Sequence, residues 1–318
     1  MIRTFYYKER NQQVKLFKDG FFGDAQNGGH WTIFDKAGNK TGVATDLDFI
    51  LCPRDSSINL YSKIRQASQE YFTCHDISWW RQEEDGYCPT GHLVSSQIHC
   101  LNHLFALRED KDALLSIINH ATKMEFDEVL PSLIDDGYLS FEFAYKNDDL
   151  IGENDKGARR GYMWTSIDAM IIARKGKDEW LIPIEWKYTE TYEKEDKTCQ
   201  KRLDRYEELI KKSDRLKMPE NGQIPHSIYF QEPSYELMRQ TLLCEQLKNN
   251  GLANNFFHLN VIPKGNTGLR EAVEKEFIPM LNDPSKFIII DPQDLLSPLK
   301  GNDDYKELIE YLETRYWK

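Results

Sequence analysis

Long apolar runs are missing from this chain of 318 residues. No stretch approaches the roughly 18 consecutive apolar residues that a membrane-spanning helix needs. Residues 1–10 also lack the apolar core of a secretory signal peptide. We therefore expect a cytoplasmic protein that makes no membrane contact.

Cysteines are few, and basic residues are not in excess. The six cysteines are scattered and include no Cys-X-X-Cys pair, which excludes a dense disulfide framework and argues against a standard structural zinc site. With 41 Lys and Arg against 52 Asp and Glu, the net charge is −11. This balance argues against a basic surface that binds nucleic acid non-specifically, but it leaves room for a local basic groove.

The remaining composition is that of a globular protein, with 40% hydrophobic and 29% charged residues. Strand-like and helix-like patterns alternate, and we find no internal repeat, low-complexity tract or obvious linker. We predict an α/β (α+β) chain in which residues 1–90 form an N-terminal β-rich elaboration or subdomain, with strands at 20–23, 31–34 and 43–51. Residues 91–318 would form the main domain. In this domain we predict a helix capped by Ser95 or Ser96 and another that a capping box at 122–125 opens and that ends by residue 135.

The stretch 164–188 has the pattern of a β-hairpin. Two apolar runs, 167–173 and 180–188, flank the polar turn Lys175-Gly-Lys-Asp178. Asp168 interrupts the first run near its start, whereas Glu185 and Lys187 interrupt the second near its end. Side chains alternate along a strand, so Glu185 and Lys187 share a face, and antiparallel pairing would bring Asp168 beside them.

Two carboxylates and an ammonium inside buried strands are costly to desolvate, so we expect them to have a function. Carboxylate oxygens suit a hard ion such as Mg²⁺, with Mn²⁺ as a substitute, which keeps water and substrate phosphate oxygens in its other positions. Lys187 could then orient the attacking water or neutralise charge on a phosphate. The alternative is an ordinary salt bridge at a sheet edge, because short motifs often match by chance.

Asp168 followed by Glu185-Trp-Lys187 resembles the core of the PD-(D/E)XK nuclease superfamily, with Ile167 in place of the proline. Segments 165–169 and 184–190, with Ser-Ser-Gln at 95–97, resemble a bacterial restriction-endonuclease-like branch over roughly residues 91–265. The resemblance implies a central mixed β-sheet flanked by helices. It also implies Mg²⁺-dependent hydrolysis of DNA by an endonuclease of the restriction or defence type.

The same resemblance implies the ligands of the ion. Asp168 and Glu185 would hold it together with the carbonyl of Trp186, and a third carboxylate would come from the segment before Asp168. Glu142, in the strand-like stretch 138–145, is our first choice for this carboxylate. Glu153 is the alternative.

Polar and basic residues on either side of the hairpin are candidates for contact with DNA. Residues 194–217 hold nine basic and six acidic side chains, with three of the basic ones spaced four apart on a predicted helix. Gln200 and Tyr206 on this helix also resemble a Gln…Tyr pattern of exonuclease-like members. The candidate contacts are Gln97, Arg159, Arg160, Lys197, Gln200, Lys201 and Arg205.

Other interpretations stay open at this point. Trp79 and Trp80 could stack bases, although such tryptophans more often fill a core. The substrate could be RNA, or the chain could be a non-catalytic nucleic-acid-binding or assembly module that keeps the charged residues as a salt-bridge network. Cleavage of both DNA strands would favour a two-fold homodimer.

Overall fold

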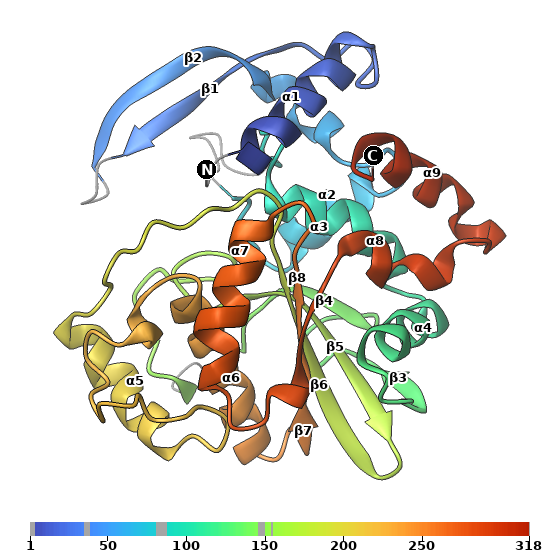
Figure 1. Cartoon of the computed structure of the whole chain (residues 1–318). Coiled ribbons are helices and arrows are strands. Elements are labelled where there is room, and N and C mark those ends of the chain that lie inside the picture. The colour runs from blue at the N-terminus through green and yellow to red at the C-terminus, as the bar shows by residue number, and fades with distance from the viewer. Residues whose placement is uncertain (1–3, 35–38, 81–87, 146–149, 154, 318) are drawn as a thin grey trace. The chain divides into compact units, whose positions relative to one another are not determined.

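The computed structural model describes residues 4–34, 39–80, 88–145, 150–153 and 155–317 (Figure 1). The chain divides into two compact units: Met1–Ala106 with Lys306–Lys318 form unit 1, and Leu107–Tyr305 form unit 2. This division differs at both ends from the predicted 1–90 and 91–318. The C-terminal segment belongs to unit 1 because the fully buried guanidinium of Arg315 donates to the Asn59 carbonyl and to Gln13.

Unit 1 combines helices with one antiparallel pair of strands. Its helices are α1 (Thr4–Lys18), α2 (Arg65–Cys74), α3 (Ser96–Leu104) and α9 (Lys306–Arg315), with a 3-10 segment at Pro53–Asn59, and its strands are β1 (Asn27–Phe34) and β2 (Lys40–Leu51). Ser95 caps α3, as its sequence predicts, by accepting a hydrogen bond from the Ile98 amide. The predicted strands at 31–34 and 43–51 are confirmed.

The β-rich prediction for the first residues missed α1. Only two apolar residues of this helix are buried, Val14 and Leu16, so the helical period is hard to detect in the sequence. The strand predicted at 20–23 is wrong, because Gly20 and Gly23 have φ of 82° and 60° and form a turn after the helix.

Unit 2 is built on a mixed sheet, as predicted, which has seven strands among the described residues. Its strands are β3 (Glu128–Leu130), β4 (Leu139–Phe143), β5 (Ile167–Lys175), β6 (Asp178–Trp186), β7 (Asn255–Phe256), β8 (His258–Val261) and β9 (Phe287–Ile290). The strand order is β3-β5-β6-β8-β9, with β4 also paired to β5 and β7 to β6. Pairing is antiparallel from β3 to β6 and parallel from β6 to β9.

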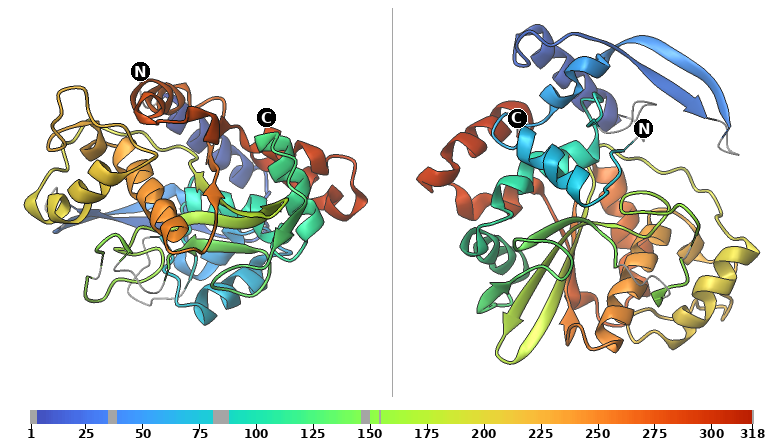
Figure 2. Two further views of the ribbon diagram at one scale, coloured as in Figure 1. Left: turned by 90° about the horizontal axis from the view of Figure 1, so that it is seen from below. Right: turned by 180° about the vertical axis from the view of Figure 1, so that it is seen from behind.

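Helices lie on both faces of this sheet (Figures 1 and 2). They are α4 (Lys111–Thr122), α5 (Gln200–Lys212), α6 (Ser234–Asn249), α7 (Thr267–Ala272), extended by a π-helical turn at Val273–Phe277, and α8 (Pro292–Leu295). The views place α5, α6 and α7 on one side of the sheet and α4 on the other. No helix in the described ranges is long and apolar enough to cross a membrane.

The hairpin of β5 and β6 is confirmed. Its first pair of residues is Ala169 with Ile184, and its last pair, next to the turn, is Lys175 with Asp178. Gly176 supplies the positive φ of 61° at the turn. Paired residues share a sheet face, so Met170, Ile172 and Leu181 lie together in the core that also contains residues of α6. Asp168 and Glu185 follow the same alternation and therefore point to the face that α6 covers.

A helix predicted to begin at Thr122 and run to about residue 133 is wrong. Lys123 adopts a left-handed φ of 56° and ends α4, and its amide donates to the Asn119 carbonyl. The Thr122 hydroxyl donates back to the Ile118 carbonyl, so Thr122 ends one helix rather than capping the next. Of the apolar residues that suggested a helix, Val129 and Leu130 belong instead to β3.

Candidate active site

The open end of the hairpin brings together the three charged residues of the motif. Asp168 is the second residue of β5, and its Oδ2 accepts a hydrogen bond of 2.7 Å from the amide of Trp186. Lys187 directly follows β6, and its amide donates to the Val261 carbonyl at 2.9 Å. The Asp168 side chain on β5 and backbone pairing with β8 therefore fix the segment that contains Glu185 and Lys187.

The Lys187 ammonium lies between two carboxylates. Its Nζ is 2.5 Å from Oε1 of Glu185 and 2.5 Å from Oε2 of Glu236, a residue in the first turn of α6. Gln240, one turn further along α6, donates its side-chain amide to Oε2 of Glu185. The Tyr192 hydroxyl is 3.5 Å from Oε2 of Glu236. Helix α6 thus adds two side chains to the predicted set.

Burial and like charge raise the pKa values of the two motif carboxylates. Burial raises the pKa of Asp168 well above its usual value, and the Glu142 carboxylate raises it further. Burial likewise raises the pKa of Glu185, with added repulsion from Asp168 and Glu236. In both cases Lys187 acts in the opposite direction without cancelling the effect. The cluster therefore gathers several carboxyl groups around one ammonium, and the charged forms of Asp168 and Glu185 are disfavoured.

Lys187 and Glu236 stabilise each other's charged forms. Burial alone would lower the pKa of Lys187, but Glu185 and Glu236 raise it well above its ordinary value. Burial would raise the pKa of Glu236, but Lys187 and Arg239 more than offset this and lower it. At neutral pH this lysine is an ammonium and cannot act as a general base.

Glu142 lies opposite Asp168. Its neighbours Phe141 and Phe143 pair with Ala169 and Ile167, so the register sets Glu142 against Asp168 on the adjacent strand. Its φ of 46° is in the left-handed region, which is uncommon for a residue other than glycine. Such backbone strain concentrates at functional sites.

Glu153, the alternative third carboxylate, belongs to a different buried network. Its two oxygens accept hydrogen bonds from the Thr165 amide at 2.5 Å, the Thr165 hydroxyl at 2.7 Å and the Tyr206 hydroxyl at 2.5 Å. Arg239 lies 3.7 Å away and completes an ion pair. This carboxylate connects the segment before β5 to α5 and α6, and its bonding capacity is taken up by protein donors.

Arg160, predicted to contact DNA, is 8% exposed and forms part of the scaffold. Its guanidinium binds both carboxylate oxygens of Asp135, at 2.6 and 2.7 Å. It also donates to the carbonyls of Phe141 and Glu142, at 2.6 and 3.1 Å. Arg160 thereby holds the end of β4 in the conformation that places Glu142 opposite Asp168.

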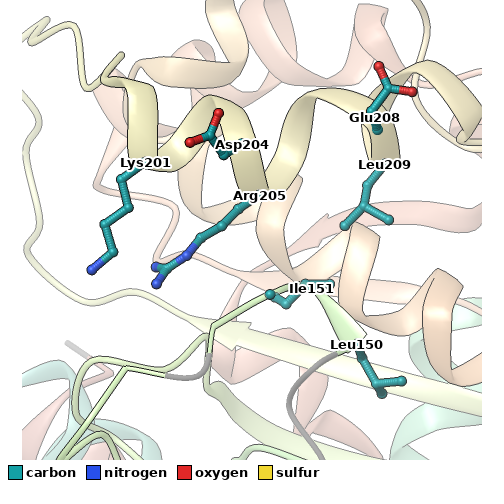
Figure 3. Close-up of a pocket in the computed structure, with 8 residues that line it drawn as sticks. Leu150, Ile151, Lys201, Asp204, Arg205, Glu208 and Leu209 are labelled. Atoms are coloured by element: carbon teal, nitrogen blue, oxygen red, sulfur yellow. The ribbon is translucent and has the colours of Figure 1, made fainter.

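The basic stripe predicted on α5 is paired with acidic residues. Figure 3 shows Lys201 and Arg205 pointing from α5 toward the segment with Ile151, beside a surface pocket of about 590 Å³. Both contact Oδ1 of Asp155, at 2.6 and 2.8 Å. Lys197 lies 3.6 Å from Glu232.

The other residues predicted to contact DNA form hydrogen bonds with other residues of the protein. Gln97, on α3 of unit 1, donates to the Ser78 carbonyl and accepts from the Trp80 amide. Gln200 donates to Asp204 at 2.7 Å, and the backbone of Arg159 pairs with that of Tyr162.

The two adjacent tryptophans have separate environments. Trp79 is 2% exposed and stacks on Phe72, with ring centroids 3.9 Å apart, so it fills the core as expected. Trp80 is 42% exposed and lies beside Trp31, with centroids 5.3 Å apart.

Sequence reasoning missed Glu236 and Gln240. Glu236 is separated from Lys187 by 49 residues and Gln240 from Glu185 by 55, so no local pattern links them. One signal was present: two polar residues four apart in a helix whose other residues are mostly buried.

Buried oxygens without donors lie beside Glu185. In the described part of the chain, Oε1 of Gln240 and Oδ1 of Asn260 have no hydrogen-bond partner, and Oε1 of Glu185 has only the ion pair with Lys187. Asn260 pairs in register with Glu185 and so shares its sheet face. Buried acceptors normally have partners, and the water shell of a hard cation would supply them.

The described residues contain no group of three His, Cys, Asp or Glu side chains arranged to hold a metal ion. Mg²⁺ does not require such a group, because it is commonly bound by one or two carboxylates and keeps several waters. Asp168 and Glu185, with the unpartnered acceptors nearby, fit that mode of binding.

A central mixed sheet flanked by helices is the architecture of the restriction-endonuclease-like class of proteins. Residues 32–317 match the family described as Restriction Endonuclease associating with ARP, and the chain belongs to this family. No curated protein and no solved structure matches the chain.

Proposed function

We propose that the chain is a metal-dependent nuclease that hydrolyses DNA phosphodiester bonds, as an endonuclease of the restriction or defence type. The observation that supports this most strongly is the convergence of Asp168, Glu185 and Lys187, in a chain of a restriction-endonuclease family. Asp168 and Glu185 have raised pKa values and lie beside acceptors that lack donors. This arrangement is better suited to binding a cation than to forming an isolated salt bridge.

Asp168 and Glu185 would hold Mg²⁺ or Mn²⁺, with Glu142 as the third carboxylate and the Trp186 carbonyl as a further ligand. We prefer Glu142 to Glu153 because Glu142 acts electrostatically on Asp168, whereas Glu153 is bonded to Thr165, Tyr206 and Arg239. A bound divalent ion would polarise the phosphate and lower the pKa of a bound water.

Lys187 supplies positive charge and hydrogen-bond donors. Because its pKa is raised, it stays an ammonium and can donate to the attacking water or to a phosphate oxygen. It does not remove the proton from the water. Those N–H groups of the Lys187 ammonium that do not bond to carboxylates are available to the substrate.

DNA binding remains a proposal for Gln97, Arg159, Arg160, Lys197, Gln200, Lys201 and Arg205. Of these, Lys201 and Arg205 already pair with Asp155, and Arg160 with Asp135, so a phosphate would compete with these carboxylates. Because the family is described as associating with ARP, we extend that association to this chain as part of the proposal. A homodimer would allow cleavage of both strands.

The test is a cleavage assay on supercoiled, linear, single-stranded and methylated DNA, and on RNA, with Mg²⁺, Mn²⁺ or EDTA. We expect metal-dependent cleavage of DNA that Asp168→Ala and Lys187→Ala each reduce at least about 100-fold. Lys211→Ala, which removes a lysine from the exposed face of α5, is the matched control and should retain activity. Undiminished cleavage by both site variants would rule out the assignment.

A second candidate function is a non-catalytic nucleic-acid-binding or assembly module. The observation in its favour is that Lys187 already pairs with Glu185 and Glu236 and forms a network without a metal ion. Calorimetric titration separates the two functions. A module of this kind would show no Mg²⁺ or Mn²⁺ binding, and Asp168→Ala would not change its binding of DNA.

A further inference from the structure

Lys187 contacts two carboxylates that reach it from different elements of the fold. Glu185 precedes it by two residues and shares its strand face, so their 2.5 Å ion pair is local. Glu236 lies 49 residues further along the chain, on α6, and reaches the same Nζ at 2.5 Å. Lys187 is 8% exposed, so solvent screens neither interaction strongly.

The local ion pair conflicts with the proposed role of Glu185. A carboxylate oxygen that neutralises an ammonium is less available to a divalent ion, and an ammonium at that distance also repels the ion. Without another partner, Lys187 would remain on Glu185, because both side chains lie on the same face and are buried. A metal ion would then have to displace it.

Helix α6 provides the other partner and also fixes the second oxygen of Glu185. Glu236 and Gln240 are four residues apart and therefore lie on the same face of α6. Gln240 donates to Oε2 of Glu185, while Glu236 attracts the ammonium that contacts Oε1. The 27% exposed side chain of Glu236 lies at the more open edge of this cluster.

We propose that Glu236 is a positioning residue that shares the Lys187 ammonium with Glu185 and thereby allows a metal ion to displace that ammonium from the Glu185 carboxylate. This inference rests on the proposed function. It adds that α6 controls the affinity of the site for the ion, through Lys187 and not through direct ligation by Glu236.

The experiment is a double-mutant cycle in which Mn²⁺ affinity is measured by calorimetry on the full chain. The four proteins are wild type, Glu236→Gln, Lys187→Met and the double variant. Glu236→Gln should weaken Mn²⁺ binding on the order of 10-fold, which is typical of the loss of a residue that orients a metal ligand. In the Lys187→Met background, where no ammonium competes for Glu185, the same substitution should change affinity less than about 3-fold.

Glu232→Gln is the matched control. It removes one negative charge four residues before Glu236, where the Glu232 carboxylate pairs with Lys197 at 3.6 Å and accepts a hydrogen bond from the Glu236 amide. Because glutamine keeps an oxygen that can accept from this amide, the variant should leave Mn²⁺ affinity unchanged. Circular dichroism of each variant checks that α6 is still folded.

Two results would overturn the inference while leaving the proposed function intact. Equal weakening by Glu236→Gln in both backgrounds would make Glu236 a direct ligand or a structural residue. Unchanged affinity of the single variant would leave Glu236 without a role. Absence of Mn²⁺ binding by the wild type would instead reject the metal site itself, and this inference with it.

Discussion

Glu185 and Glu153 are both buried glutamates of unit 2, yet their surroundings differ. Glu153 accepts three hydrogen bonds and pairs with Arg239, so donors satisfy its charge. Glu185 faces Asp168 and Glu236, which with burial raise its pKa. The first arrangement stabilises the fold. The second lowers the stability of the folded chain, and a bound cation would offset this loss.

His258 offers a prediction about pH and stability. Both of its ring nitrogens lack a hydrogen-bond partner in the described part of the chain, and burial lowers its pKa to about 3. Because this value is below that of the unfolded chain, the unfolded state takes up the proton first as pH falls. The contribution of neutral His258 to folding stability is complete above its unfolded pKa of about 6.5. It is lost progressively as the pH falls toward its pKa in the folded protein.

The wild type should therefore lose unfolding free energy as the pH falls from about 7.5 to about 5.5. In His258→Leu this loss should be smaller by about 1.4 kcal/mol. Urea denaturation of wild type and variant at both pH values measures this difference. An identical pH dependence in the two proteins would show that His258 is not buried in its neutral form.

At the scale of the element, Arg160 determines how β4 ends. Replacing it with Met leaves Asp135, whose side chain is fully buried, without its cation. The expected loss of stability is about 3–5 kcal/mol, as for other broken buried ion pairs. Arg174→Met is the control, because its pairs with Glu128 and Glu179 are partly exposed and should contribute less than about 1 kcal/mol. Equal losses in urea denaturation would contradict the scaffold role of Arg160.

The hairpin was predictable because its information is local. Asp168, Glu185 and Lys187 fall within one pair of strands, and Gly176 marks the turn between them. The contributions of α6 were harder to predict, because a helix buried on most of its surface has no polar face, and the four-residue spacing of Glu236 and Gln240 is the one local signal. The acidic partner Asp155 escaped notice for a similar reason, since its contacts with α5 cross 46 residues of sequence.

At the scale of the whole molecule, the two ends of the chain meet in unit 1. Arg315 donates to the main-chain carbonyl and the side-chain oxygen of Asn59, while Gln13 donates to the Arg315 carbonyl at 3.1 Å. Sequence alone gave no sign of this closure, because the partners lie 256 and 302 residues apart. The family match over residues 32–317 includes parts of both units.

Loss of the C-terminal segment should therefore destabilise the N-terminal helices. Arg315→Met removes the guanidinium that donates to the buried side-chain oxygens of Asn59 and Gln13, at a cost of about 1–3 kcal/mol for each. Hydrogen exchange should show reduced protection in α1 and α3, with the β5–β6 hairpin unchanged. Reduced protection confined to α9 would mean that the C-terminus does not support unit 1.

The central claim is that the cluster around Glu185 hydrolyses phosphodiester bonds. The most direct measurement compares Glu185→Gln with Glu153→Gln, two substitutions of the same type at buried sites, by the rate of Mg²⁺-dependent nicking of supercoiled plasmid per folded molecule. Glu185→Gln should reduce this rate at least about 100-fold, whereas Glu153→Gln should retain activity within about 10-fold of wild type. Equal rates for the two variants, or full activity of Glu185→Gln, would contradict the claim.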